Sequence, residues 1–149
     1  MTRSPKRILV ATDLSPESDE ALMDAIALAR EAGAALEILY VLELEVEQYP
    51  LGFAFAGDHA GLMTYVEREL ARRAELASQA GVSCSVKALE GNAATDIVDY
   101  GDEVGADLIV VGTHGRKGLI HALLGSVAEK VVQRAKCPVL TIPISKKAA

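Results

Sequence analysis

Short apolar runs alternate along this sequence with longer segments whose apolar residues recur at helical spacing. The apolar runs lie at residues 8–11, 36–42, 82–86, 107–111 and 139–144, and helical segments separate them. Such segments are long enough to return the chain so that successive strands run parallel. The pattern β-α-β-α-β-α-β-α-β therefore predicts an α/β fold, a three-layer α/β/α sandwich with one five-stranded parallel sheet.

Capping residues and glycines predict where the helices begin and end. Ser15 precedes the first helix as a cap, with Pro16 at its first position, and Gly33 follows its end. Asn92 caps a third helix that ends near Gly105. These signals divide the chain into short, regularly alternating elements of one domain that spans residues 1–149.

The second and last helices are predicted from their apolar spacing. The second runs over about 61–79, and we expect the arginines and glutamates between its apolar residues to form a solvated face. The last begins at about Ser126, carries basic residues near its end, and stops at Cys137-Pro138.

The segment 43–60 is irregular and unusually long for a connection in a compact domain. It contains Pro50, Gly52 and Gly57 among aromatic and aliphatic residues. Two interpretations are open: a packed surface insertion, or a loop that covers a ligand or contacts a partner.

Strand composition predicts the order of the sheet. The runs 8–11 and 107–111 are uniformly apolar, as central strands are, whereas 82–86 alternates and suits an edge. These features fit the order 3-2-1-4-5, which reverses between the first and fourth strands. Ligands of such sheets bind outside the carboxyl ends of the strands at this reversal. Those ends carry Thr12-Asp13 and residues 112–115.

The glycine-spaced stretch from Gly112 to Ser126 has the parts of a phosphate site. Gly112 and Gly115 follow a buried strand, where backbone N–H groups can approach an anion, and Gly125-Ser126 opens a helix. It is neither a Walker A loop nor a GxGxxG dinucleotide motif. The glycines alone fit two interpretations equally: turns and helix ends, or phosphate binding.

The spacing Gly112-x2-Gly115-x9-Gly125-Ser126 resembles the motif of ATP-binding members of the universal stress protein family. The resemblance covers nearly the whole chain, including the blocks 8–15, 107–116, 123–131 and 137–143. It implies a Rossmann-like fold of the kind found in adenine nucleotide α-hydrolases. One departure is Gly91-Asn92-Ala93, where the family often has a proline at the third position.

The resemblance also implies which residues contact the nucleotide. Thr12 and Asp13 lie at the adenosine end, and Val41 lies beside the adenine. The stretch from Gly112 through Thr113 to Gly115 borders the ribose and phosphates. The helix start receives the phosphates through Gly125, Ser126 and Val127.

Charged residues near these positions have two interpretations each. Asp13 can accept hydrogen bonds from ribose hydroxyls or simply stabilise the first helix through its charge, and the resemblance favours the nucleotide. Arg116 is expected to contact phosphate. His114 and Lys117 are more simply solvated, and His59 and His121 are ordinary surface histidines.

Charge and cysteine content exclude other classes. The net charge is −6, which argues against partners that attract clustered positive charge, so neither nucleic acid nor a membrane surface is expected. The N-terminus has no signal-type apolar segment, and Cys84 and Cys137 are expected to be free, partly buried thiols. A reducing cytoplasm fits these features.

The sequence thus predicts an ATP-binding stress-response or signalling module that holds ATP with Mg²⁺ and whose downstream partner is unknown. We expect no dedicated enzyme, because no nucleophile–base pair or P-loop lysine stands out. The alternatives are a slow ATPase or autophosphorylating enzyme using the same pocket, and a dimeric interaction module without nucleotide. The apolar last strand, 139–144, needs covering, and the resemblance implies a homodimer through it.

Overall fold

The computed structural model describes residues 4–43, 59–113 and 125–143 of the chain. Strands and helices alternate through these residues as the sequence predicts. Their bounds are β1 (Arg7–Thr12), α1 (Ser18–Ala32), β2 (Ala35–Leu42), α3 (His59–Gln79), β3 (Cys84–Glu90), α4 (Ala93–Val104), β4 (Leu108–Gly112), α5 (Ser126–Arg134) and β5 (Val139–Ile142).

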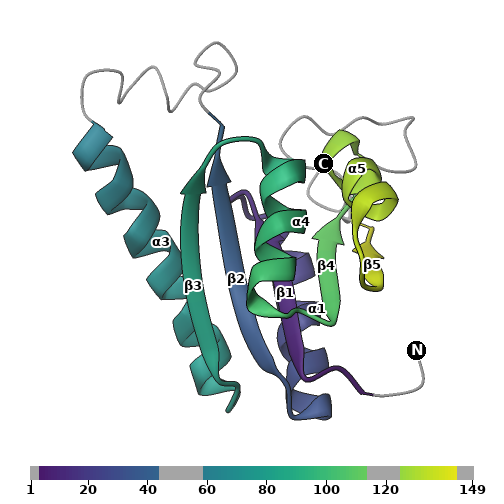
Figure 1. Ribbon diagram of the computed structural model, residues 1–149. Helices are drawn as coiled ribbons and strands as arrows, with labels where there is room; N and C mark the ends of the chain where they lie inside the picture. The colour runs from purple at the N-terminus through teal and green to yellow at the C-terminus, as the bar shows by residue number, and fades with distance from the viewer. Residues whose placement is uncertain (1–3, 44–58, 114–124, 144–149) are drawn as a thin grey trace.

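The strands form one parallel sheet in the order β3-β2-β1-β4-β5, which confirms the predicted topology. Helices α4 and α5 cover one face of the sheet, and α1 and α3 cover the other (Figure 1). The first and fourth strands lie at the centre, and Val10 pairs with Val110 between them. The carboxyl ends of β1 and β4 therefore lie side by side at the point where the strand order reverses.

Alternate residues of the central strands fill two separate hydrophobic layers. Ile8 and Val10 pack toward α1 and α3, whereas Leu9 packs toward α4 and α5. All three side chains are fully buried. This two-sided burial explains why β1 is apolar without interruption, while the edge strand β3 leaves Val86 exposed.

The helix boundaries follow the predicted signals closely. Gly33 and Gly105 end α1 and α4 in the left-handed conformation, with φ of 66° and 73°. The Asn92 side chain accepts a hydrogen bond from the Thr95 N–H and caps α4. At α1 the prediction is partly wrong: Pro16 and Glu17 form a turn, and the regular helix begins at Ser18.

The arginine prediction for the second helix is wrong at one position. Arg73 is only 1% exposed and is among the largest fully buried side chains. Its spacing explains this, because the buried residues of α3 are Val66, Leu70, Arg73 and Ala77 on one helix face. The neighbouring Arg72 is exposed, as expected.

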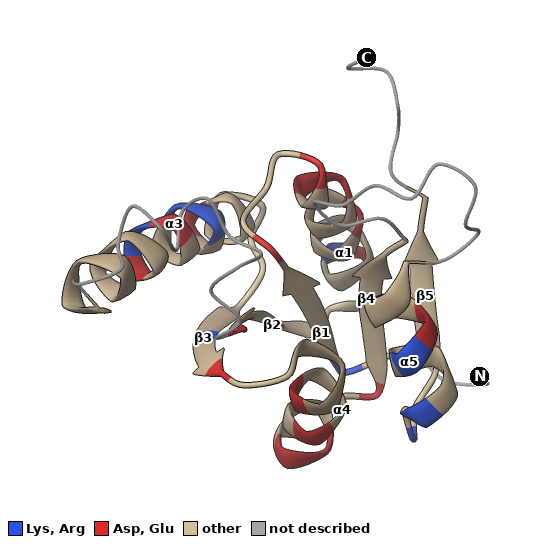
Figure 2. Cartoon of the chain, turned by 90° about the horizontal axis from the view of Figure 1, so that it is seen from above, with Lys and Arg blue, Asp and Glu red and all other residues tan. Residues whose placement is uncertain are grey.

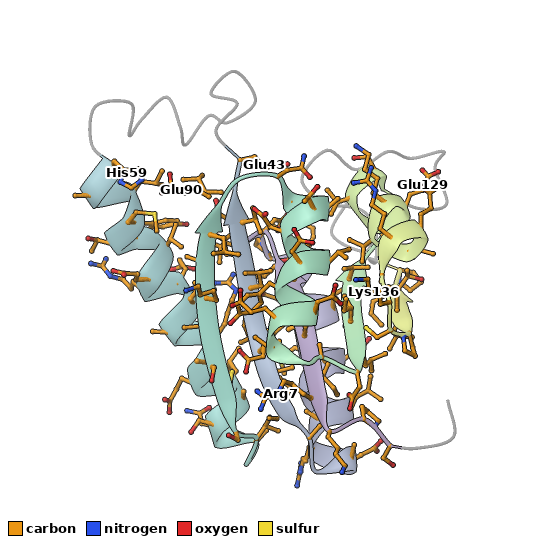
Figure 3. The ribbon with its side chains drawn as sticks, in the orientation of Figure 1. Arg7, Glu43, His59, Glu90, Glu129 and Lys136 are labelled. Carbon is orange, nitrogen blue, oxygen red and sulfur yellow. The ribbon has the colours of Figure 1, made fainter. Side chains whose placement is uncertain are left out.

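A buried carboxylate also lies within the sheet. Glu37 of β2 is 5% exposed and accepts hydrogen bonds from Arg7 Nη1 at 2.7 Å and from the Tyr100 hydroxyl at 3.3 Å. Burial and the nearby Glu37 charge raise the pKa of Tyr100. Figure 3 shows Arg7 at the amino-terminal end of the sheet, opposite the switch point.

Several expectations fall at the edges of the described residues. Strand β5 ends at Ile142, and Ile144 of the predicted strand lies outside the described part, as do residues 44–58 of the irregular segment. His59, which the sequence placed in that segment, instead begins α3 and lies 3.1 Å from a Glu90 oxygen through Nε2 (Figure 3). No helix in the described ranges is long and apolar enough to span a bilayer.

Candidate functional site

The loop after β1 is built by a chain of side-chain hydrogen bonds. Thr12 and Ser18 hydroxyls lie 3.0 Å apart, and Ser18 Oγ donates to the Ser15 carbonyl. Because a hydroxyl has one proton, Thr12 must donate to Ser18. Thr12 Oγ1 also accepts from the Leu14 N–H at 3.0 Å. The Thr12 hydroxyl is thus used inside the protein and shapes the loop.

Asp13 is held in the same loop through one carboxylate oxygen. Its Oδ1 accepts hydrogen bonds from the Ser15 N–H, at 2.9 Å, and from the Ser15 hydroxyl. Ser15 Oγ in turn accepts from the Ser18 N–H, so Ser15 bonds to the first residue of α1, although the N-cap position itself is Glu17, which makes no side-chain cap bond. Asp13 is partly exposed, and in the described part of the chain no donor is found on its Oδ2. That oxygen can accept hydrogen bonds from a ligand.

Leu14 gives the loop its tight turn. Its φ is 65°, and among the described residues it is the only non-glycine residue with positive φ. Such a conformation costs free energy for a residue with a side chain, so its surroundings must stabilise it. Leu14 is buried, with an exposed fraction of 7%.

The second half of the site lies at the end of β4. Thr113 is buried, donates its N–H to the Ile142 carbonyl at 3.0 Å, and accepts at its own carbonyl from the Gly125 N–H. This last bond fixes the start of α5 against the end of β4. The structure therefore brings Gly112 and Thr113 next to Gly125, Ser126 and Val127.

The first turn of α5 offers backbone donors. The first helical bond runs from the Glu129 N–H to the Gly125 carbonyl at 2.9 Å. The N–H groups of residues 126–128 precede this bond and have no partner within the helix. Ser126 is exposed and Val127 half-buried. A helix start of this kind attracts anions through its N–H groups and its dipole.

Strand register places the two halves together. Val10 pairs with Val110, and Thr12 and Gly112 each follow two residues further along these parallel strands. Val41 lies on the next strand out, one residue before the end of β2, half-buried beside α4. Gly115 and Arg116, with His114 and Lys117, lie outside the described residues.

The loop that lacks the family's proline has a different bond in its place. The Ala93 N–H, which a proline would not have, donates to Glu43 Oε2 at 3.1 Å. The Gly91 N–H donates to the Leu42 carbonyl, so residues at the end of β2 bond twice to the connection between β3 and α4. Figure 3 shows Glu43 at this end of the sheet, close to the start of α4.

Charges are unevenly distributed around this edge. Figure 2 looks onto the carboxyl ends of the strands: the charged residues of α4 are all acidic, whereas α3 and α5 carry both signs. The start of α5 offers backbone donors to an anion.

Both cysteines are free and half-buried, which confirms the sequence prediction. Burial, with a further contribution from the Glu37 charge, raises the pKa of Cys84 to about 11. Burial also raises the pKa of Cys137. Both groups stay protonated and weakly nucleophilic near neutral pH. In the described ranges no three His, Cys, Asp or Glu side chains are grouped to hold a metal ion.

The chain matches one protein family over nearly its whole length. The model of the universal stress protein family matches residues 5–143. The chain belongs to the universal stress protein family. A relative from Methanocaldococcus jannaschii, universal stress protein MJ0531, is 36% identical over 95% of this chain and 84% of that protein. Universal stress protein YxiE of Bacillus subtilis is 37% identical over 91% of this chain and 97% of its own length.

Solved structures share the fold. Protein MJ0577 superposes with a TM-score of 0.81 over 95% of this chain and 97% of its own, and at 24% identity this likeness concerns the fold alone. A universal stress protein solved in complex with cAMP has a TM-score of 0.72 and 28% identity, covering 95% of this chain and 99% of that one. The Archaeoglobus fulgidus protein in complex with dAMP has a TM-score of 0.66 and 26% identity, covering 92% and 97%.

Proposed function

We propose that this universal stress protein binds ATP with Mg²⁺ at the carboxyl ends of β1 and β4 and acts as a nucleotide-dependent regulatory module. One observation carries the proposal. The Gly125 N–H to Thr113 carbonyl bond fixes the first-turn amides of α5 beside the end of β4, one strand away from the Asp13 carboxylate. Phosphates are bound by helix-start amides, and ribose hydroxyls by a carboxylate.

The residues present fit an adenine nucleotide in that orientation. Asp13 keeps one oxygen for the ribose because Ser15 occupies only the other. Val41 offers an apolar surface and backbone groups for the adenine at the end of β2. In this orientation the phosphates are bound by Gly112, Gly115, Arg116, Gly125, Ser126 and Val127. Mg²⁺ binds with them as their counter-ion.

Nucleotide-bound relatives support the class of ligand. The neighbours with cAMP and dAMP are 28% and 26% identical to this chain, and both ligands are adenine nucleotides. The extension to a triphosphate rests on this chain's own glycine spacing and on the start of α5.

We place the function in holding ATP rather than consuming it rapidly. Fast phosphoryl transfer needs a cation on the γ-phosphate and a group that orients the nucleophile. The glycine-spaced stretch of this sequence does not end in the Gly-Lys-Ser/Thr of a P-loop. Signalling through nucleotide occupancy in the cytoplasm, by a single domain spanning residues 1–149, is the role that fits this chemistry.

The test is release of bound nucleotide. The protein is purified without added nucleotide and denatured, and the supernatant is chromatographed for adenine nucleotides. Intact ATP supports binding without fast turnover. If nothing is released and calorimetry with Mg-ATP shows no heat, the binding proposal is wrong.

A slow ATPase or autophosphorylating enzyme is the second candidate and uses the same pocket. Release of ADP alone would favour it. Incubation with γ-labelled ATP separates its two forms, because autophosphorylation labels the protein and hydrolysis releases labelled phosphate.

The homodimer through β5 has a specific backbone basis. The carbonyls of Pro138 and Ile142 accept from β4, so alternate residues of β5 turn their backbone groups toward the sheet. Val139 and Thr141 therefore direct their N–H and C=O groups toward the open edge. A second copy of the strand can pair there, as we propose for residues 139–144.

The dimer is tested by light scattering on wild type and Thr141→Pro. The proline removes one outward N–H group but no donor to β4, so a dimer should become monomeric with the fold intact by circular dichroism. Thr141→Val, which keeps the outward N–H group and the branched side chain, is the matched control at the same position. A strictly monomeric wild-type protein would remove the proposal.

A further inference from the structure

The buried Arg73 of α3 connects that helix to the loop that carries Asp13. All five guanidinium N–H groups have acceptors: two on the Asp19 carboxylate, two on Glu69 and one on the Leu14 carbonyl. The bonds to Asp19 Oδ1 and Glu69 Oε1 measure 2.9 Å, and the bond to the Leu14 carbonyl measures 3.1 Å. A guanidinium has five such donors, so none is left unsatisfied in the interior.

The bond to Leu14 differs from the three bonds to carboxylate oxygens of Asp19 and Glu69. Arg73 also donates to the neutral Glu69 carbonyl, but that bond stays within α3. Asp19 and Glu69 carry the countercharges and balance the buried cation, which is sufficient for a structural ion pair. A neutral carbonyl adds no countercharge. Its residue, however, is the one held in the left-handed conformation next to Asp13. This one bond therefore satisfies the fifth donor of Arg73 and at the same time contacts the loop that carries Asp13.

Arg73 and Thr12 together hold both sides of Leu14. Thr12 Oγ1 accepts from the Leu14 N–H, and Arg73 Nη2 donates to the Leu14 carbonyl. The two peptide groups that flank the unfavourable φ are thereby fixed. Asp13 lies before this turn and Ser15 directly after it, so the turn sets the distance over which Ser15 reaches the Asp13 carboxylate.

We infer that Arg73 is a positioning residue for the nucleotide site: through the Leu14 carbonyl it holds the loop in the conformation that presents Asp13 to the adenosine end of the ligand. The inference rests on the proposed function, which assigns Asp13 to that end. It adds a residue from α3, a helix that contributes nothing to the site in the sequence motif.

Binding of three ligands by isothermal calorimetry tests the inference: adenosine, AMP and ATP with Mg²⁺. In Arg73→Met the Leu14 bond is lost, and all three affinities should fall by the same factor, about tenfold, because releasing a strained turn frees the loop. An equal loss of affinity for the three ligands would place the effect at the adenosine end, because adenosine is the part that all three share. A loss confined to ATP would place the effect at the phosphates and overturn the inference.

Asp19→Asn is the matched structural control. It removes the charge that pairs with Arg73 but leaves the arginine and its bond to the Leu14 carbonyl. Affinities should stay within about twofold of wild type even where thermal stability falls. If Asp19→Asn loses as much affinity as Arg73→Met, Arg73 serves stability only, and the inference is wrong.

Two further measurements keep the outcomes separate. If Arg73→Met does not fold, Arg73→Lys retains the cation without the planar fork and should show the same equal loss, smaller in size. In amide NMR spectra of the ligand-free proteins, Leu14 and Ser15 signals should shift in the Arg73 variants but not in Asp19→Asn. Wild-type protein that binds none of the three ligands overturns the proposed function itself, whereas unchanged binding in a folded Arg73 variant overturns only this inference.

Discussion

The two halves of the candidate site are built in opposite ways. The loop after β1 is held by side chains, with Thr12, Asp13, Ser15 and Ser18 bonded to one another and Arg73 bonded from α3. The connection from β4 to α5 is held by backbone groups, through the Thr113 carbonyl and the Gly125 N–H. The first half therefore depends on the side chains that are present, and the second on a side chain that is absent at Gly125.

This difference predicts how each half fails. Removing a side-chain group should damage the β1 half, and adding one should damage the β4 half. The two halves should also report on different parts of the ligand, the adenosine end and the phosphates.

The largest expected effect is that of Gly125→Val. Gly125 has φ of −70° and ψ of 165°, a conformation open to any residue, so the fold should persist by circular dichroism. In the proposed site the added side chain should occupy the phosphate position and raise the Kd for ATP about 100-fold or more, since several charge-assisted hydrogen bonds would be lost. Calorimetry gives the Kd. The Kd of Gly125→Ala for ATP should lie between those of the wild type and Gly125→Val. Unchanged affinity in Gly125→Val would show that the segment is only a turn.

Arg73→Met should have the largest effect on folding stability. It leaves Asp19 and Glu69 without their buried partner, and we expect a loss of about 3 kcal/mol in urea unfolding. Arg72→Met removes only the exposed partner of the same Glu69 and should change stability little. Equal losses in the two variants would contradict the role of burial.

The ion pair between Arg73 and Glu69 predicts that folding stability depends on pH. Hydrogen bonds from Arg73, and secondarily from Arg72, lower the pKa of Glu69 below its ordinary value of 4.5. A lowered folded-state pKa means that this stabilisation is present above pH 4.5 and is lost as the pH falls through the folded-state pKa. In Arg73→Met the larger cause is gone, so the fall in stability below pH 4.5 should be shallower. Urea unfolding at several acidic pH values measures this slope, and an unchanged slope would contradict the assignment to Arg73.

Asp13→Asn tests the β1 half with its geometry preserved. The amide oxygen can still accept from Ser15, but the charge offered to the ribose is gone, and the Kd for adenosine and for ATP should each rise about tenfold or more. Asp24→Asn, an exposed residue of α1, controls for net charge. A change in ATP affinity without a change in adenosine affinity would place Asp13 near the phosphates instead.

The smallest effects come from two serines that should behave oppositely. Ser15→Ala removes the hydroxyl that accepts from the Ser18 N–H at the start of α1 and should cost about 1 kcal/mol of stability. Ser126→Ala should leave stability unchanged, because that side chain is exposed and α5 has no side-chain cap. Ser126→Ala should weaken ATP binding about threefold, because one hydrogen-bond donor is lost. Thermal unfolding and calorimetry on both variants would expose any reversal of this pattern.

The sequence determined the strand order and, with it, the edge at which the carboxyl ends of β1 and β4 meet. Uniform apolarity in β1 and β4 reflects burial on both faces of the sheet, and the mixed composition of β3 reflects an edge strand with several exposed residues. Caps and glycines such as Asn92, Gly33 and Gly105 act within a few residues of the chain, so they too could be predicted.

Only the tertiary structure decided that Arg73 is buried and that its guanidinium bonds to the Leu14 carbonyl. A charged residue between apolar positions of a helix is usually solvated, and the buried stripe of α3 accepts Arg73 only because Asp19 and the Leu14 carbonyl are packed opposite. These partners lie 54 and 59 positions away in the sequence. Periodicity records which side of a helix is buried, but it carries no information about which acceptors face that side from another element.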